Sequence, residues 1–235
     1  MKAMVFAAGV GSRLKELTQK RPKCLMEVGG LTLLEHVIAK LKGAGVTSLM
    51  INVHHLHQQV IDFTASKSSF GIDISFSYED SLLDTGGGLK KVAPFFKGES
   101  AFFIHNSDIF SDIDLLQLLT QHRTSRAAAT LAVMKRDSHR GLYFDESGQL
   151  RGWTEEKDSP ATERQGELLA FSGVSVASDK IFNYFPEGEV FSLIQPYLNV
   201  ARNLLPVRAF RVDGVPWTDI GTPESLAALQ KRLGC

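Results

Sequence analysis

The sequence predicts an α/β fold in which a mostly parallel central sheet carries helices on both faces. In the first half of the chain, apolar runs typical of strands alternate with segments of helical character. This alternation is typical of parallel sheets, because each crossover helix packs back onto the sheet. Ligands of such sheets bind beyond the carboxyl ends of the strands. The residues that directly follow each strand are therefore the first place to look for a site.

The first half supplies four strands and four helices in alternation. Short apolar runs predict strands at 2–7, 48–53, 72–78 and 101–106. Helices are expected between and after them, at 32–42, 57–66, 87–96 and 114–123. Thr32 is a suitable N-cap for the first helix, and Gly43 and Gly45 end it.

The second half predicts a less regular arrangement. Strands are expected at 128–135, 168–176 and 207–212, and a hairpin at 143–153 that turns around 146–148. Two short helices are expected near 180–184 and 189–201, and a closing helix at 223–233. Thr222 is placed to cap the closing helix, with Pro223 in its first turn. The segment 157–166 is polar and is predicted to be a loop.

Length and charge narrow the classes of protein. The chain has 235 residues with 26 basic and 26 acidic side chains, so it can bury a sizeable core and does not resemble a nucleic-acid-coating protein. The first 42 residues carry eight basic and three acidic side chains, which suits a small anionic ligand. The two cysteines suggest neither a disulfide framework nor a zinc site. No apolar run is long enough to span a bilayer, so a cytoplasmic protein without membrane or nucleic-acid partners is expected.

The first strand leads into a glycine-rich turn that predicts a phosphate site. Gly9 and Gly11 follow the strand, Arg13 comes next, and Lys23 lies ten residues further on. Such a turn brings backbone N–H groups close to a phosphate, and the two cations supply the countercharge. No Lys-Ser or Lys-Thr follows the glycines as in a Walker A loop. Leu14 occupies the third small position of a dinucleotide fingerprint, which disfavours an NAD-dependent oxidoreductase.

Two aspartates are candidates for a metal site. Asp108 comes just after the strand at 101–106, where a carboxylate suits either Mg²⁺ or a helix cap, and neither reading is favoured from this residue alone. Asp219 precedes the closing helix. Capping there uses Thr222, which leaves the Asp219 carboxylate without a role assigned from the residues alone. Two carboxylates from distant parts of the chain can share one Mg²⁺ with triphosphate oxygens.

Taken together, these segments resemble the sugar-1-phosphate nucleotidyltransferases. That family's usual form is L-A-A-G-x-G-T-R-L followed by P-K-P-L, and this chain reads F-A-A-G-V-G-S-R-L and P-K-C-L. Phe6, Ser12 and Cys24 depart from the pattern without removing a charge. The segment W-T-D-I-G-T-P-E at 217–224 matches the family's W-x-D-x-G-T-P-E at every fixed position. The resemblance extends over nearly the whole chain.

The resemblance implies a fold and a domain organisation. The fold is the Rossmann-like nucleotide-diphospho-sugar transferase fold, with a mixed, mostly parallel central sheet and helices on both faces. Residues 1–235 would form one domain, since no repeat or linker is evident. Within it, 1–125 would mainly bind the nucleotide, and 126–235 would mainly bind the sugar and supply the closing helix.

The resemblance also implies site residues. The nucleotide-binding positions would be Ala7, Ala8, Gly9, Gly11, Arg13, Lys23, Gly86, Gly87 and Asp108. The sugar-binding positions would be Glu156, Lys157 and Gly173. Asp108 and Asp219 would hold Mg²⁺ as the cofactor. The catalytic residues would be Arg13 at the leaving pyrophosphate, Lys23 near the α-phosphate and Lys157 at the sugar phosphate. Asp158 stands where the family has Pro after this lysine, so an exposed charged loop is the alternative for Lys157.

The implied reaction joins a sugar-1-phosphate to an NTP and gives an NDP-sugar and pyrophosphate. The sugar phosphate is itself the nucleophile, which agrees with the lack of a recognisable protein nucleophile motif. The segments most resemble compact N-acetylmuramate-1-phosphate uridylyltransferases and mannose-1-phosphate guanylyltransferase-like proteins, with a slight preference for UTP. GTP or CTP as the donor, a phosphocholine cytidylyltransferase, and a non-catalytic nucleotide-sugar-binding regulator stay open as alternatives. A homo-oligomer is compatible with the sequence.

Overall fold

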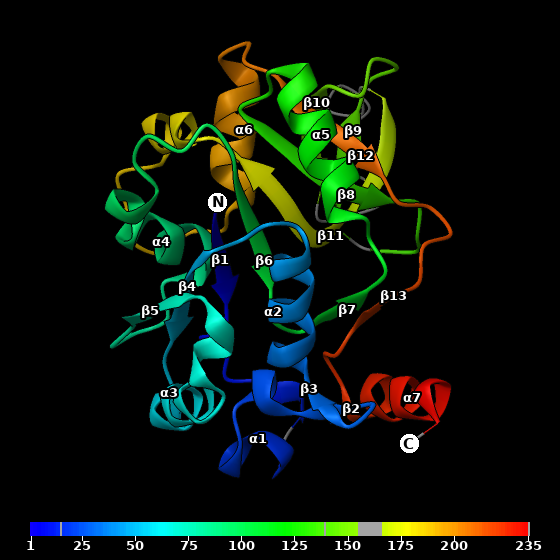
Figure 1. The fold of residues 1–235 in the computed structure, drawn as a ribbon. Helices are drawn as coiled ribbons and strands as arrows, with labels where there is room; N and C mark the ends of the chain where they lie inside the picture. Colours follow the sequence, from blue (N-terminus) through cyan, green and yellow to red (C-terminus); the bar gives the residue numbers. More distant parts are fainter. Residues whose placement is uncertain (15, 139, 155–165, 235) are drawn as a thin grey trace.

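The computed structural model describes residues 1–14, 16–138, 140–154 and 166–234, built around a nine-stranded mixed sheet. Its main path runs β10-β9-β11-β6-β1-β4-β5, and β8 joins β11 to β12 (Figure 1). The strands of this sheet are β1 (Lys2–Phe6), β4 (Ser48–Val53), β5 (Asp73–Tyr78), β6 (Phe102–Asn106), β8 (Ala129–Met134), β9 (Gly141–Phe144), β10 (Leu150–Thr154), β11 (Glu167–Ala177) and β12 (Val207–Arg211). The predicted α/β fold with a mixed central sheet is confirmed.

The first-half strands form the parallel part of the sheet. β1 lies between β4 and β6, and β5 adds to β4, all in parallel register. The carboxyl ends of β1 and β6 are adjacent, because Phe6 pairs with Asn106. β11 then runs antiparallel to β6, β8 and β9, so the second half changes the direction of the sheet. The loops after β1 and β6 therefore meet at one edge, where the sequence places its phosphate and carboxylate motifs.

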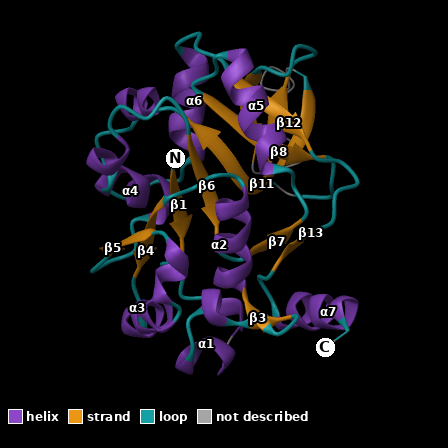
Figure 2. Ribbon diagram, in the orientation of Figure 1, coloured by secondary structure: helices purple, strands orange, loops and turns teal. Residues whose placement is uncertain are grey.

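Helices cover both faces, as predicted (Figure 2). The helices are α1 (Glu16–Lys20), α2 (Leu33–Gly43), α3 (His57–Ser66), α4 (Asp84–Lys91), α5 (Leu115–Ser125), α6 (Ile194–Arg202) and α7 (Pro223–Leu233). Successive residues of β1 point to opposite faces, so Ala3 and Val5 pack with α2 and α5, whereas Met4 packs with α4 and α6. This two-sided burial explains why the strand is apolar throughout.

Helix boundaries mostly follow local chemistry. Thr32 caps α2 in a reciprocal capping box with Glu35. The predicted helix 87–96 is wrong in its limits: α4 spans Asp84–Lys91, and a separate 3₁₀ turn follows at Ala93–Phe96. Pro94 lacks the N–H group that a continuing helix needs, which accounts for the break. The predicted helix 189–201 likewise begins only at Ile194.

Two short ribbons were not predicted. β2 (Glu27–Val28) pairs with β3 (Leu31–Thr32), and β7 (Ile109–Ser111) pairs antiparallel with β13 (Trp217–Asp219). The second ribbon lies between the sheet and α7, as Figure 1 shows. It joins the segment after β6 to the segment before α7.

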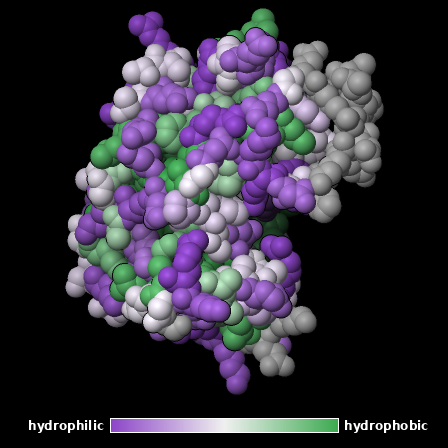
Figure 3. Space-filling view, turned by 90° about the vertical axis from the view of Figure 1, so that its right-hand side faces the viewer, coloured by the Kyte–Doolittle hydropathy of each residue, from purple (hydrophilic) through white to green (hydrophobic). Residues whose placement is uncertain are grey.

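The surface is predominantly polar on the face that Figure 3 shows, with scattered apolar residues. Large exposed hydrophobic side chains such as Leu204 and Val190 lie in separate loops, one on either side of α6 in the chain. Scattered residues of this kind are ordinary for a folded surface. No helix among the described residues is long and apolar enough to cross a membrane.

Candidate active site

The turn after β1 is shaped by Gly11. This residue has φ of +64°, and a Cβ there would lie 2.7 Å from the Thr18 Cγ2 atom. Its carbonyl accepts hydrogen bonds from the Leu14 N–H at 2.8 Å and the Thr18 hydroxyl at 3.0 Å. Only glycine adopts this backbone without strain. Gly9 has no atom within 4 Å of its Cβ position, so space remains beside the backbone there.

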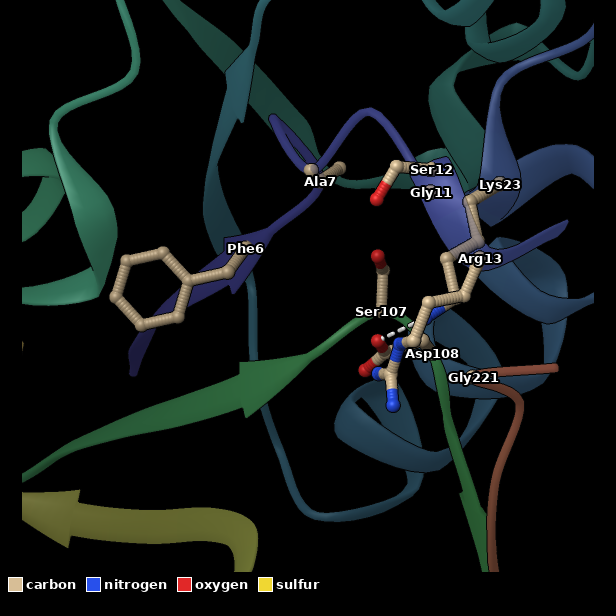
Figure 4. Close-up of a pocket in the computed structure, with 10 residues that line it drawn as sticks. Phe6, Ala7, Gly11, Ser12, Arg13, Lys23, Ser107, Asp108 and Gly221 are labelled. Atoms are coloured by element: carbon tan, nitrogen blue, oxygen red, sulfur yellow. Dashed lines mark hydrogen bonds and ion pairs between the residues drawn. The ribbon is translucent and has the colours of Figure 1, made fainter. Parts of the chain in front are cut away.

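Arg13 and Lys23 are presented by two short 3₁₀ turns, Ser12–Leu14 and Lys23–Leu25. Each turn has a buried apolar anchor beside its cation: Leu14 in the first, Leu25 in the second. In Figure 4 both cations reach toward Asp108 at the end of β6. Cys24, between Lys23 and Leu25, is fully buried, which raises the pKa of its thiol to about 12. A thiol with this pKa is not a nucleophile near neutral pH.

The β7–β13 ribbon brings the two aspartates together. Asp219 pairs in register with Ile109, and the Ile220 N–H donates to the Asp108 carbonyl at 2.9 Å. The Lys23 ammonium contacts Asp108 and lies 4.0 Å from the Asp219 Oδ1 atom. Residues far apart in sequence are thus combined into one cluster of two carboxylates with a cation.

Opposing effects act on the charge of the Asp219 carboxylate. Burial and the nearby charge of Asp108 raise the pKa of Asp219, whereas Lys23, Arg13 and Arg136 oppose that rise. Its Oδ1 atom is buried and has no hydrogen-bond partner among the described residues. A buried carboxylate oxygen without a hydrogen bond costs free energy, and a cation closer than Lys23 would offset that cost.

Divalent metal suits this pair of carboxylates. Oxygen ligands are those that Mg²⁺ prefers, and it often keeps substrate phosphates and water as its other ligands. Among the described residues no group of three or more His, Cys, Asp or Glu side chains is arranged to hold a metal. Asp108 and Asp219 therefore fit a metal shared with a phosphate ligand and do not form a complete protein cage.

Two cavities meet at this cluster. The smaller, of about 180 Å³, is lined by the turn after β1 together with Lys23, Asp108 and Gly221 (Figure 4). The larger, of about 910 Å³, is lined by Asp219 and by residues from both halves of the chain. Phe6 and Arg13 line both. The cluster thus lies where a phosphate chain in one cavity would meet a group in the other.

A buried network holds the strand ends in place. The Ala7 N–H donates to Asn52 Oδ1 at 2.8 Å, and Asn52 Nδ2 donates to Glu79 Oε1 at 2.7 Å. The other Glu79 oxygen accepts from the Leu83 N–H at 3.1 Å. A Cβ at Gly88 would lie 2.8 Å from Glu79 Oε1, so the helix approaches the network closely. The network connects β1, β4 and β5 to α4, and sequence reasoning missed it.

The glycine run lies within the first turns of α4. The N–H groups of Gly86 and Gly87 donate to the Phe191 carbonyl at 2.9 and 3.2 Å. A Cβ at Gly86 would lie 2.4 Å from the Phe191 ring, so close helix packing requires this glycine. From this segment, Asp84 and Thr85 line the larger cavity.

The remaining predicted residues are placed as follows. Ala7 lines the smaller cavity, and its neighbour Ala8 is buried. Gly173 has φ of +80° at the irregularity of β11, where a Cβ would lie 3.0 Å from the Asn106 amide nitrogen. Glu156 and Lys157 lie outside the described residues. Arg136, which sequence reasoning did not single out, lines the larger cavity.

Sequence comparison relates the whole chain to known enzymes. The family described as "Nucleotidyl transferase" matches residues 2–234. A curated N-acetylmuramate alpha-1-phosphate uridylyltransferase of Neisseria meningitidis is 30% identical over 100% of this chain and 99% of its own length. A UTP–glucose-1-phosphate uridylyltransferase of Synechocystis is 27% identical, and a mannose-1-phosphate guanylyltransferase of Mycobacterium tuberculosis 28%, each over 94% of this chain. The chain spans only about 60% of the length of these last two relatives.

Structural comparison supports the fold independently. A putative glucose-1-phosphate thymidylyltransferase from Bacillus anthracis superposes with a TM-score of 0.83 at 22% identity, covering 99% of this chain and 95% of the other. A UDP-glucose pyrophosphorylase complexed with UDP-glucose superposes with a TM-score of 0.80 at 16% identity, covering 98% and 97%. At these identities the superpositions establish a common fold.

Proposed function

Because the chain belongs to the nucleotidyl transferase family, we propose that it joins a sugar-1-phosphate and an NTP into an NDP-sugar and releases pyrophosphate. One observation carries the proposal: Arg13, Lys23, Asp108 and Asp219 converge at the junction of two cavities. The smaller cavity suits the triphosphate, because its wall is a glycine turn with two cations. The larger suits the sugar phosphate.

The reaction requires the protein to position the two substrates and to stabilise negative charge on the phosphates. An oxygen of the sugar phosphate forms a bond to the α-phosphorus of the NTP, and the bond from that phosphorus to the β-phosphate oxygen breaks. The electron pair leaves with pyrophosphate, so no protein nucleophile takes part. Arg13 binds the leaving pyrophosphate, Lys23 the α-phosphate region and Lys157 the sugar phosphate. Fixed cations in a partly dry site stabilise the charge that develops during such a transfer.

Asp108 and Asp219 would hold Mg²⁺ in this proposal. When bound, Mg²⁺ supplies charge neutralisation to the phosphate oxygens. Among the described residues, Asp219 Oδ1 is the site carboxylate oxygen that is buried without a hydrogen-bond partner, which supports this assignment. The ribbon includes Asp219, and Asp108 directly precedes its other strand, so backbone pairing sets the positions of both carboxylates.

We infer that UTP is the preferred donor, with GTP and CTP as alternatives. The curated relatives include enzymes named for uridylyl transfer and enzymes named for guanylyl transfer. Two relatives matched over nearly their full length are named as uridylyltransferases, which supports UTP. The division into a nucleotide-binding part (1–125) and a sugar-binding part (126–235), a homo-oligomer and a cytoplasmic location remain predictions from the sequence.

A pyrophosphate-release screen tests the function. Four NTPs are combined with a panel that contains glucose-1-phosphate, mannose-1-phosphate, N-acetylmuramate-1-phosphate and phosphocholine, each with Mg²⁺. Release should require both substrates, and the NDP-sugar should form in equal amount. Tight Mg-NTP binding without turnover for any pair would contradict the proposal and favour the non-catalytic regulator.

A further inference from the structure

Arg136 is held against an aromatic ring beside the carboxylate cluster. It follows β8 by two residues, and its guanidinium carbon lies 4.2 Å from the centroid of the Trp217 ring. Trp217 is fixed in turn, because its indole N–H donates to the Ser172 carbonyl at 2.9 Å and its backbone pairs with Ser111. A stacked guanidinium keeps its N–H groups in the plane of the fork, free to bind at the edge.

The location of Arg136 connects it to the reacting groups. Trp217 and Asp219 are two residues apart on β13, so their side chains lie on the same face of that strand. The charge of Arg136 acts on Asp219 and opposes the rise of its pKa. Arg136, Arg13 and Asp219 all line the larger cavity. The guanidinium is therefore beside the place where the attacking phosphate must lie.

Among the described residues, most N–H donors of the Arg136 guanidinium are not used in hydrogen bonds. Its recorded hydrogen bond among the described residues is one from Nη2 to the Phe171 carbonyl at 3.5 Å, at the outer limit for such a bond. Burial lowers the pKa of Arg136, and the charge of Asp219 raises it. The side chain is still exposed to solvent, so its unused N–H groups are accessible to a ligand. An accessible guanidinium with unused N–H groups can bind a phosphate in bidentate fashion, because its fork matches two phosphate oxygens.

The rest of the larger cavity suits a sugar. Beyond Arg136 its wall combines the aromatic side chains of Trp153 and Phe171 with the amides of Asn106 and Gln195. Aromatic faces pack against the apolar side of a sugar ring, and amides bind its hydroxyl groups. A ligand with its ring against these residues would direct its phosphate toward the carboxylate cluster.

We propose that Arg136 binds the phosphate of the sugar-1-phosphate, and that Trp217 is the positioning residue that holds it there. This inference rests on the proposed function. It explains why an arginine is stacked on the strand that carries Asp219: the same ribbon then aligns the metal carboxylate and the nucleophile.

Steady-state kinetics of Arg136→Gln test this inference, with the substrate pair of highest turnover in the screen. Removing the charged hydrogen bonds should raise KM for the sugar-1-phosphate roughly 10- to 100-fold and leave KM for the NTP within about twofold. Arg136→Lys should recover part of the loss, and Trp217→Leu should raise the same KM by a smaller factor. Arg151→Gln is the matched control, since Arg151 pairs with Asp145 on the surface, and its constants should match wild type.

Each outcome decides the question. An unchanged KM for the sugar-1-phosphate in Arg136→Gln, with wild-type turnover intact, would refute the inference alone. Equal rises in both KM values would also overturn it, because Arg136 would then act through Asp219 and not on the sugar phosphate. If Arg136→Gln does not fold, Arg136→Lys decides by the same split between the two KM values. Wild-type chain without turnover for any pair would refute the proposed function, and this inference with it.

Discussion

Acid should destabilise this protein through His122, a buried histidine of α5. Its side chain is buried, and its Nδ1 atom lies 3.1 Å from the Thr130 hydroxyl. Burial lowers the pKa of His122 from its usual 6.5 to about 4, and the nearby Arg123 adds to this. The unfolded chain keeps the ordinary pKa. Between pH 6.5 and 4 the unfolded chain therefore binds a proton that the folded chain does not, and stability falls as the pH falls.

The size of the effect follows from the two pKa values. A difference of about 2.5 units corresponds to roughly 3 kcal/mol when the titration is complete, at about 1.4 kcal/mol for each unit. About 2 kcal/mol of this is lost between pH 7 and pH 5. His105 is also buried, and its pKa is lowered to about 4. Its effect on the unfolding free energy is the same in wild type and in a His122 variant, so it cancels in the comparison.

Urea unfolding followed by tryptophan fluorescence at pH 7 and pH 5 measures this contribution. His122→Gln cannot be protonated, so its loss of unfolding free energy between the two pH values should be about 2 kcal/mol smaller than that of wild type. His55→Gln is the matched control, because His55 is exposed, and it should lose as much as wild type. Equal losses in wild type and His122→Gln would refute the reasoning.

Three further predictions concern the site. Asp219→Asn should lower turnover at least about 100-fold and leave the melting temperature unchanged. Excess chelator should abolish wild-type turnover, and substantial activity in chelator would exclude a metal role. Arg13→Ala and Lys23→Ala should each lower kcat/KM roughly 100-fold or more, whereas the control Lys42→Ala should leave it unchanged. Equal, mild effects of all three substitutions would mean that the triphosphate binds elsewhere. Lys157→Ala should weaken binding of the sugar-1-phosphate in calorimetry while Mg-NTP affinity stays the same, and an unchanged sugar-phosphate affinity would leave Lys157 as a surface residue.

The parts of the fold that sequence predicted are those with local causes. β1 is a run of apolar residues, and the glycine turn after it has one backbone solution that Gly11 alone accepts. The N-caps Thr32 and Thr222 act on residues three positions away, so their helices were located from sequence. The chemistry of Arg13 and Lys23 could be inferred for the same reason.

The parts that sequence did not predict depend on distant partners. β7 and β13 have three residues each, too few for a periodic pattern, and they form because they pair with each other. The helix that was expected from residue 87 begins at Asp84, so Gly86 lies inside it, where the segment around Phe191 leaves no room for a side chain. Arg136 showed no motif at all, since only the fold stacks it on Trp217.

The β7–β13 ribbon has a consequence for biosynthesis. On the ribosome, the residues of β1, β4 and β6, together with Lys23 and Asp108, are made long before Asp219 emerges. The second carboxylate arrives only when Trp217–Asp219 pairs with β7. Under the proposed function, the chain can therefore turn over substrate only after residues 217–219 have been made. A product that terminates before Trp217 would retain the turn after β1 and would be expected to lack turnover.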